Sequence, residues 1–326
     1  MSPAQLLVES LRASRGFAHK RDISAVMTSL AGSLQNGIAV GDDCAAIPDE
    51  QGHLLFAIEG FVEDFVASDP WFAGYCGVMV NVSDIAAMGG RPLAVVDALW
   101  SDGAAAGDPV LQGMAEASRR YAVPIVGGHS NHHAPRGQLA VAIVGRAGKR
   151  LLTSFDAQPG DALVMAIDLR GEWRGKNPFW NASTRAPAER LRADLDLLPG
   201  LAEDGLCAAA KDISMAGALG TALMLLECSG VGAQIDVAAI PRPDSVALDD
   251  PAALLRWLCA FPSFGFILSV KPAQTDAVLA RFAARGIAAA VVGQVNDAPR
   301  VTIAHAGDSA ELWNLAAQPF ITAARA

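Results

Sequence analysis

Short apolar runs with the character of β-strands alternate with helical segments along most of this chain. Apolar runs at about 54–58, 93–99, 138–144, 162–167, 264–270 and 287–295 have the length of strands. Helices are expected at about 71–88, 110–121, 215–228 and 273–285, and the polar stretch 147–161 separates the two halves. This alternation predicts an α/β (α+β) protein of two domains, residues 1–148 and 149–326.

The first forty residues are predicted to form two helices joined by a basic loop. The first helix runs from about Gln5 to Ala13, and Asp22 is expected to cap a second helix that continues to about Leu34. Between them lies the basic segment 15–21, which contains Lys20.

Three acidic motifs with neighbouring glycines are the candidates for chemistry. They are Gly41-Asp42-Asp43, the segment Asn81 to Gly90 that contains Asp84, and Lys211-Asp212-Ile213-Ser214. Mg²⁺ prefers hard oxygen ligands and shares them between a protein and the phosphates of its substrate. Each motif also has a plainer interpretation: an Asx turn at Asp42 and Asp43, and a helix cap at Asp212.

On a helix over 71–88, the side chains of Asn81, Asp84 and Met88 fall on one face. A carboxylate and an amide three residues apart are neighbours on a helix and can serve one ligand. A solvated helix flank is the alternative. Gly89 and Gly90 open the end of the same face and favour a ligand.

Composition excludes several other classes. The net charge is −9 without a basic stripe, which disfavours nucleic acid as a partner. Five scattered cysteines without a Cys-x-x-Cys pair indicate reduced thiols. No apolar run approaches the length needed to span a bilayer, so a cytoplasmic protein with no membrane partner is expected.

A strand over 123–126 is expected to end in Gly127-Gly128-His129, where the glycines would let the backbone approach a phosphate. The nearby His132 and His133 make zinc an alternative, although no cysteine or acidic residue is close in sequence. The chain has neither a P-loop motif nor a Gly-x-Ser-x-Gly elbow. A nucleotide would therefore be held by another kind of site, and acyl transfer has little support.

These motifs resemble those of the AIR synthase-like (PurM-like) superfamily over nearly the whole chain. The superfamily includes thiamine-monophosphate kinase, selenophosphate synthetase and the hydrogenase maturation factor HypE. The segment Asn81 to Gly89 is similar to its Asn-x-Ser-Asp-x-x-Ala-Met-Gly helix, and Gly41-Asp42-Asp43 resembles the kinase's Gly-Asp-Asp-Ala. The segment 127–130 is similar to the Gly-Gly-His motif of selenophosphate synthetase, and the whole pattern is most similar to the AIR synthase-related branch.

The resemblance implies an N-terminal domain that dimerises through its sheet and a C-terminal α/β domain, with ATP and Mg²⁺ as cofactors. Asp42, Asp43, Asp84 and Asp212 would then hold Mg²⁺ at the ATP phosphates. Asn81, Gly127 and Gly128 would contact the phosphates, and Met88 and Gly89 would shape the nucleotide pocket.

Some positions depart from the pattern of the relatives. The strand that should end in Thr-Asp ends in Ile58-Glu59-Gly60, so Glu59 is a longer candidate metal ligand. His129 replaces the kinase's aspartate and is a candidate to lie over the site. No cysteine precedes Cys44, and the chain ends without the terminal cysteine that carries the HypE reaction.

We therefore expect phosphoryl transfer from Mg-ATP to a small-molecule acceptor, in a homodimer. Lys20 and Arg91 are candidate catalytic cations that would meet the γ-phosphate or the acceptor. The segment Trp173–Trp180 either covers the acceptor or is a packed surface loop. Two rival functions remain open: an ATP-dependent ligase or cyclase, and a nucleotide-binding protein without turnover.

Overall fold

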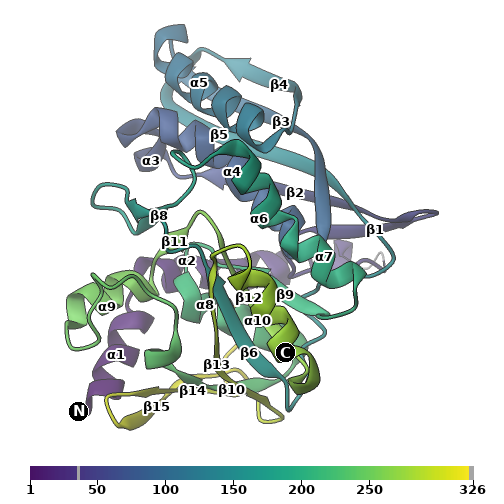
Figure 1. Ribbon diagram of the computed structural model, residues 1–326. Coiled ribbons are helices and arrows are strands. Elements are labelled where there is room, and N and C mark those ends of the chain that lie inside the picture. Colours follow the sequence, from purple (N-terminus) through teal and green to yellow (C-terminus); the bar gives the residue numbers. More distant parts are fainter. Residues whose placement is uncertain (35–36, 323–326) are drawn as a thin grey trace. The chain divides into compact units, whose positions relative to one another are not determined.

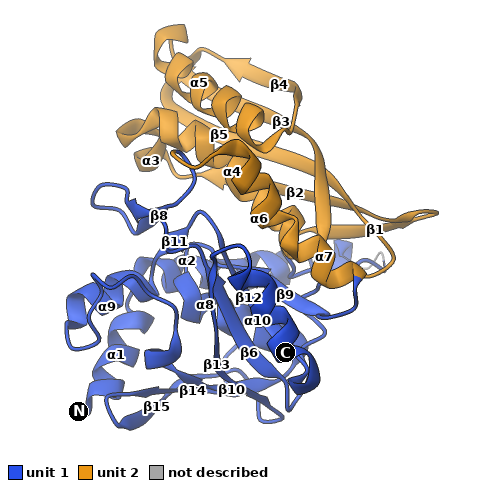
Figure 2. Ribbon diagram, viewed as in Figure 1, with its two compact units in different colours: residues 1–42, 152–184, 204–326 blue, residues 43–151, 185–203 orange. Residues whose placement is uncertain are grey.

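The computed structural model describes residues 1–34 and 37–322 (Figure 1). It divides into two compact units, which Figure 2 shows in different colours. Unit 1 comprises residues 1–42, 152–184 and 204–326, and unit 2 comprises residues 43–151 and 185–203. The N-terminal segment therefore packs with the second half of the chain, and a short segment of the second half packs with the first. The predicted division between residues 148 and 149 stays a prediction, and the compact units differ from it by these exchanged segments.

Unit 2 is built on a five-stranded sheet, whose order within the described residues is β1-β2-β5-β3-β4. Strands β3 and β4 run parallel, and the other neighbours are antiparallel. Helices α4 and α5 pack on one face of this sheet (Figure 1). The elements of unit 2 are β1 (Ala45–Asp49), β2 (Gly52–Phe61), α3 (Glu63–Ser68), α4 (Pro70–Ala87), β3 (Gly90–Asp102), α5 (Ala104–Tyr121), β4 (Ile125–Asn131), β5 (His133–Ala147), α6 (Ala188–Leu195) and α7 (Leu197–Glu203).

Helix α4 begins and ends where the sequence supplies helix caps. The Asp69 side chain accepts a hydrogen bond of 3.4 Å from the backbone N–H of Phe72, and Pro70 lies in the first turn. Gly89 follows the helix with φ +72°, a conformation that glycine adopts without steric cost. Every residue from Phe72 to Ala87 is buried. The helix predicted over 71–88 is thus confirmed to within one residue, as a helix enclosed on all sides.

Two glycines allow α4 and α5 to approach each other closely. A Cβ atom added to Gly74 would lie 1.9 Å from the carbonyl oxygen of Val110, and one added to Gly113 would lie 1.9 Å from that of Trp71. Both distances are far below van der Waals contact. The crossing is therefore made backbone to backbone, and it fixes where α4 lies on the sheet.

The sheet face that points away from α4 is apolar and exposed. Ile58 on β2 is 65% exposed, and Val126 on β4 is 64% exposed, with Phe56 at 51% and Val96 at 41%. The strand register places Ile58 and Val96 on either side of Ala142. The apolar patch is thus continuous across β2, β5 and β3, which is typical of a surface that another protein covers.

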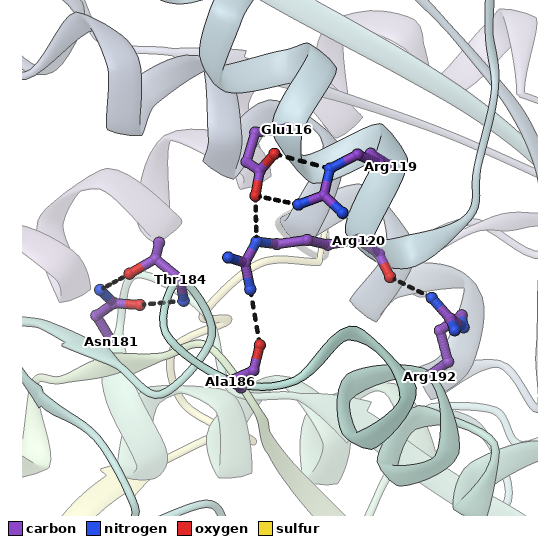
Figure 3. Close-up of polar contacts among 7 residues, drawn as sticks. All are labelled: Glu116, Arg119, Arg120, Asn181, Thr184, Ala186 and Arg192. Atoms are coloured by element: carbon purple, nitrogen blue, oxygen red, sulfur yellow. Dashed lines mark hydrogen bonds and ion pairs between the residues drawn. The ribbon is translucent and has the colours of Figure 1, made fainter.

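Helix α6 and the segment before it are held against α5 by arginine contacts that Figure 3 shows. The Arg120 guanidinium on α5 donates a 2.6 Å hydrogen bond to Glu116 and a 2.7 Å bond to the carbonyl oxygen of Ala186. In return, Arg192 on α6 donates a 2.9 Å bond to the carbonyl oxygen of Arg120. Because Arg120 is only 19% exposed, water does not readily replace these contacts.

We expect Arg120→Met to lower the free energy of unfolding by about 1–2 kcal/mol, because it removes two charge-assisted hydrogen bonds and keeps the apolar stem. Urea denaturation measures this change. Arg119→Met is the matched control, since Arg119 binds the same Glu116 but is 65% exposed, and surface pairs contribute about 0–1 kcal/mol. Equal losses for the two variants would show that the Ala186 contact does not anchor the segment.

Unit 1 contains a seven-stranded sheet of order β15-β14-β10-β13-β6-β12-β9 in the described residues. Its neighbours are antiparallel except β10 and β14. Unit 1 also contains a small sheet of order β11-β8-β7. The helices are α1 (Pro3–Arg12), α2 (Arg15–Leu30), α8 (Gly217–Ser229), α9 (Pro251–Leu258) and α10 (Thr275–Ala283), with short 3₁₀ turns at Ala31–Ser33, Val237–Ala239 and Pro272–Gln274. The strands are β6 (Ala162–Ile167), β7 (Glu172–Trp173), β8 (Phe179–Asn181), β9 (Ala209–Asp212), β10 (Gly232–Asp236), β11 (Phe261–Pro262), β12 (Gly265–Val270), β13 (Ala288–Asn296), β14 (Arg300–His305) and β15 (Asp308–Asn314).

The basic loop predicted over 15–21 is wrong: this segment is the first part of α2. Ser14 caps the helix by accepting a 3.4 Å hydrogen bond from the N–H of Phe17, whose side chain is fully buried. Asp22, the predicted cap, lies inside the helix. A buried aromatic residue three positions after a serine cap outweighs the basic residues around it.

Several helices and strands of unit 1 agree closely with the runs that the sequence predicts. Strand β6 coincides with the predicted run, and β12 and β13 differ from theirs by one residue at one or both ends. Helix α8 begins at Gly217, two residues later than expected. None of the described helices combines the length and the apolarity that crossing a membrane requires.

Candidate metal and nucleotide site

Asn81 and Asp84 lie on α4, and both side chains are buried. Asn81 is fully buried and Asp84 is 4% exposed, so the alternative of a solvated helix flank is wrong. The Asn81 amide nitrogen donates to the carbonyl oxygens of Gly77, at 2.7 Å, and of Val141 on β5, at 3.0 Å. These bonds fix the amide orientation. They leave its buried oxygen Oδ1 without a hydrogen-bond partner in the described part of the chain.

Asp43 brings a second carboxylate close to Asp84. The two side chains have carboxylate oxygens within 4.8 Å of each other, although they are about forty residues apart in the sequence. Two carboxylates at this separation repel unless a cation or a proton lies between them. Together with the buried amide oxygen of Asn81, they are the hard oxygen donors that suit Mg²⁺. The donor set thus fits the metal that the sequence predicts.

Asp42 lies at the end of the first segment of unit 1 and has a different environment. Its carboxylate accepts hydrogen bonds from Ser154, at 2.8 Å from the backbone N–H and at 2.7 Å from the hydroxyl group. This carboxylate therefore joins the chain before β1 to the segment after β5. Its role as a metal ligand stays a prediction.

Glu59 is half-buried on β2, on the face shared with Leu55 and Ala57. Among the described residues, it does not form a group of three ligands with Asp43 and Asp84 at the same close separation. Its role as a ligand also stays a prediction.

Asp212 is the last residue of β9 in unit 1, and it is 3% exposed. It does not cap α8, because the residue at the cap position is Ala216, which makes no side-chain cap. The plainer interpretation of Asp212 as a helix cap is therefore wrong. The role of Asp212 as a metal ligand stays a prediction.

The glycines Gly127 and Gly128 lie within β4, not after a strand as predicted, because β4 continues to Asn131. His129 is exposed, and its ring lies 6.4 Å from that of Trp100. Among the described residues, no close group of three potential metal ligands contains a histidine. The zinc alternative therefore gains no support from the geometry.

The two candidate cations have different surroundings. Lys20 on α2 follows Gly16 by one helical turn, and a Cβ atom at Gly16 would lie 2.3 Å from the carbonyl oxygen of Met215. Lys20 is therefore on the same face of α2 as Gly16, the face that packs against the segment before α8. Arg91, at the start of β3, pairs with Glu203 and, at 2.7 Å, with Asp196. These carboxylates, Glu203 first, raise the pKa of Arg91 above its usual value. They also neutralise its charge locally.

Met88 and Gly89 have clear local roles. Met88 is 1% exposed and caps α4, while Gly89 supplies the left-handed turn that follows. Their part in a nucleotide pocket stays a prediction.

The tryptophans of the segment Trp173–Trp180 are packed. The rings of Trp173, Trp180 and Trp257 meet edge to face at centroid distances of 5.3–5.9 Å. The Arg256 guanidinium lies 4.0 Å from the centroid of the Trp173 ring. The structure therefore favours the interpretation of this segment as an ordered surface hairpin.

Comparison with known proteins agrees with this two-unit α/β fold. Residues 41–147 match the AIR synthase related protein N-terminal domain, and residues 158–306 match the corresponding C-terminal domain. Protein sll0787 of Synechocystis is 47% identical over 319 residues, which is 96% of each chain. The chain therefore belongs to the AIR synthase-related family, as the motifs predicted.

Relatives that are named for an activity are less similar to this chain. Thiamine-monophosphate kinase of Synechococcus elongatus is 27% identical over 308 residues, with 84% of this chain and 89% of the kinase covered. The solved structure of AaThiL complexed with AMPPCP and TMP superposes with a TM-score of 0.68 at 18% identity, covering 87% of this chain and 93% of that one. PurL of Thermotoga maritima, complexed with ATP, gives a TM-score of 0.75 at 18% identity. This chain spans about half of PurL, since 99% of it covers 53% of the longer protein. These likenesses confirm the PurM-like fold.

Proposed function

We propose that this protein transfers the γ-phosphoryl group of Mg-ATP to a small-molecule acceptor. The observation that carries the proposal is the pair of carboxylates of Asp43 and Asp84, whose oxygens lie within 4.8 Å of each other. The similarity to thiamine-monophosphate kinase, which extends over 84% of this chain, supports it. So does the ATP bound to PurL.

In this proposal Asp43 and Asp84 hold Mg²⁺, which would neutralise charge on the phosphates of bound ATP. Asp42, Glu59 and Asp212 are further ligands that the family motifs imply. The role of the protein in such a transfer is to position the reactants and to balance charge. Asn81 is suited to the first task because its amide is locked by two backbone carbonyls.

Other proposed contacts follow the family motifs. Gly127, Gly128 and His129 lie near the phosphates, and Met88 and Gly89 near the nucleotide. Lys20 supplies a positive charge to the transferred group. Arg91 is a weaker candidate for that task, because Asp196 and Glu203 already balance its charge.

The test is a titration of the purified protein with ATP, with and without Mg²⁺, read by melting temperature and by calorimetry. We expect ATP to bind and to raise the melting temperature only when Mg²⁺ is present. Candidate acceptors are then screened by measuring the ADP that is formed with each of them. A stable phosphorylated acceptor supports a kinase, whereas free phosphate with a dehydrated product supports the ligase alternative. Binding without turnover on any acceptor supports a protein that only binds nucleotide, and no binding refutes the proposal.

We also propose that the exposed sheet face of unit 2 is covered by a second copy of this chain, as the family resemblance implies. The variant Ile58→Lys would place a charge in the centre of the apolar patch. It should convert a dimer to a monomer, measured by light scattering after size exclusion. Val26→Lys is the control, since Val26 is also 55% exposed but lies on α2 in unit 1. A wild-type monomer, or a dimer that survives Ile58→Lys, would contradict this.

A further inference from the structure

Asp97 is a carboxylate inside unit 2 that none of the motifs includes. It lies on β3 between Val95 and Leu99, whose side chains are buried against α4 and α5. Because alternate residues of a strand share a face, the Asp97 side chain points to the same side of the sheet as theirs. It is half-buried there.

This carboxylate has no compensating cation among the described residues. Its environment is dominated by desolvation, which raises the pKa of Asp97, and the only opposing contact is its own backbone N–H. A carboxylate removed from water without a counter-charge destabilises the folded protein. Such residues concentrate at functional sites, where the cost is offset by activity.

The neighbours of Asp97 are residues that the proposed function already uses. In the β3–β4 register Asp97 lies opposite Gly128, and a Cβ atom on Gly128 would be 2.3 Å from the Asp97 oxygen Oδ1. On its other side Asp97 lies opposite Val141, whose carbonyl oxygen accepts the bond from Asn81. The carboxylate thus lies against Gly128, and its residue is the cross-strand partner of Val141, to which Asn81 is bonded.

We propose that Asp97 is the general base that takes the proton from the acceptor during phosphoryl transfer. This inference rests on the proposed function. The attacking oxygen or nitrogen of the acceptor forms a bond to the γ-phosphorus, and the bond from that phosphorus to the bridging oxygen of ADP breaks. The proton of the attacking atom passes to the Asp97 carboxylate. The acceptor is therefore a compound with a hydroxyl or amine group, and Asp97 touches it.

The test compares the wild-type protein, Asp97→Asn and Asp97→Glu with Mg-ATP, using water and hydroxylamine as small surrogate acceptors. Phosphate and ADP release give the rate, and calorimetry gives the affinity for Mg-ATP. We expect Asp97→Asn to slow transfer by at least on the order of a hundredfold without changing affinity. The wild-type rate should fall as the pH drops through the pKa of Asp97, whereas the slow Asn variant should show a flat acid limb. Asp97→Glu should recover part of the rate.

Asp102→Asn is the matched control, because Asp102 is an exposed carboxylate at the end of the same strand. An Asp97→Asn protein that transfers at the wild-type rate overturns the inference and leaves the proposed function intact. Loss of Mg-ATP affinity in this variant overturns the role of a base in favour of a metal ligand. A wild-type protein that does not bind Mg-ATP, or binds it and transfers to neither surrogate, overturns the inference as well.

The melting temperature of Asp97→Asn provides a second readout. Replacing a carboxylate that only stabilises the fold would lower this temperature, whereas replacing Asp97 should raise it. Because the folded-state pKa of Asp97 is raised, the folded protein binds this proton more tightly than the unfolded chain. The charged carboxylate therefore lowers the free energy of unfolding above the folded-state pKa. This loss disappears as the pH falls below the pKa of an aspartate in the unfolded chain. Asp97→Asn should melt higher than wild type at pH 7, with the difference narrowing toward acid pH. A variant that melts lower at pH 7 would overturn the inference.

Discussion

The Asp84→Asn variant should lose the Mg²⁺-dependent binding of ATP while keeping its fold. Asp84 is buried on α4, and its carboxylate lies within 4.8 Å of that of Asp43. The substitution keeps the shape of the side chain but removes one of the two negative charges, on Asp43 and Asp84, that would face the metal. Loss of residues that only orient metal ligands costs about 10–100-fold in affinity or activity, so loss of a ligand should cost more. We therefore expect turnover to fall by at least about a hundredfold and the melting shift with Mg-ATP to vanish.

Asp108→Asn is the control for this experiment. Asp108 is an exposed carboxylate on α5 in the same unit, so its loss changes the net charge equally without touching the acidic pair. Circular dichroism and the melting temperature without ligand show whether each variant folds. If folded Asp84→Asn binds ATP as tightly with Mg²⁺ as wild type does, then the pair does not hold the metal. The proposed function would then lose the observation that carries it.

The sequence was sufficient to locate α4 and its polar residues, because their information is local. The cap at Asp69, the turn at Gly89 and the helical spacing of Asn81 and Asp84 all lie within twenty-one residues of one another. The same holds for β6 and β13, where a short apolar run specifies the strand.

The environments of the acidic residues could not be predicted in this way, since they depend on contacts distant in the chain. Asp42 and Asp43 are adjacent in the sequence, but the carboxylate of Asp42 is bound by Ser154, more than a hundred residues away. The significance of Asp97 depends on the register that places it opposite Gly128. Residues 185–203 join unit 2 through Arg120 and Ala186, and neither residue has a local pattern that indicates its partner.

The largest structural effect is expected at the crossing of α4 and α5, where Gly113→Ala should destabilise unit 2 by about 3 kcal/mol. The added methyl group would lie 1.9 Å from the carbonyl oxygen of Trp71 and 2.8 Å from the backbone nitrogen of Tyr75. Neither atom belongs to a flexible side chain, so the helices must separate. Urea denaturation of the purified protein measures the loss.

Gly200→Ala is the matched control, because Gly200 is also helical and nothing lies within 4 Å of its added Cβ atom. It should be neutral or stabilising by up to about 1 kcal/mol, since alanine favours the helix and restricts the unfolded chain. The crossing also decides the orientation of α4, from which Asn81 and Asp84 project. Gly113→Ala should therefore weaken Mg-ATP binding even under conditions where it remains folded. If Gly113→Ala is as stable as Gly200→Ala, then the helices have room to adjust, and the close approach does not position these side chains.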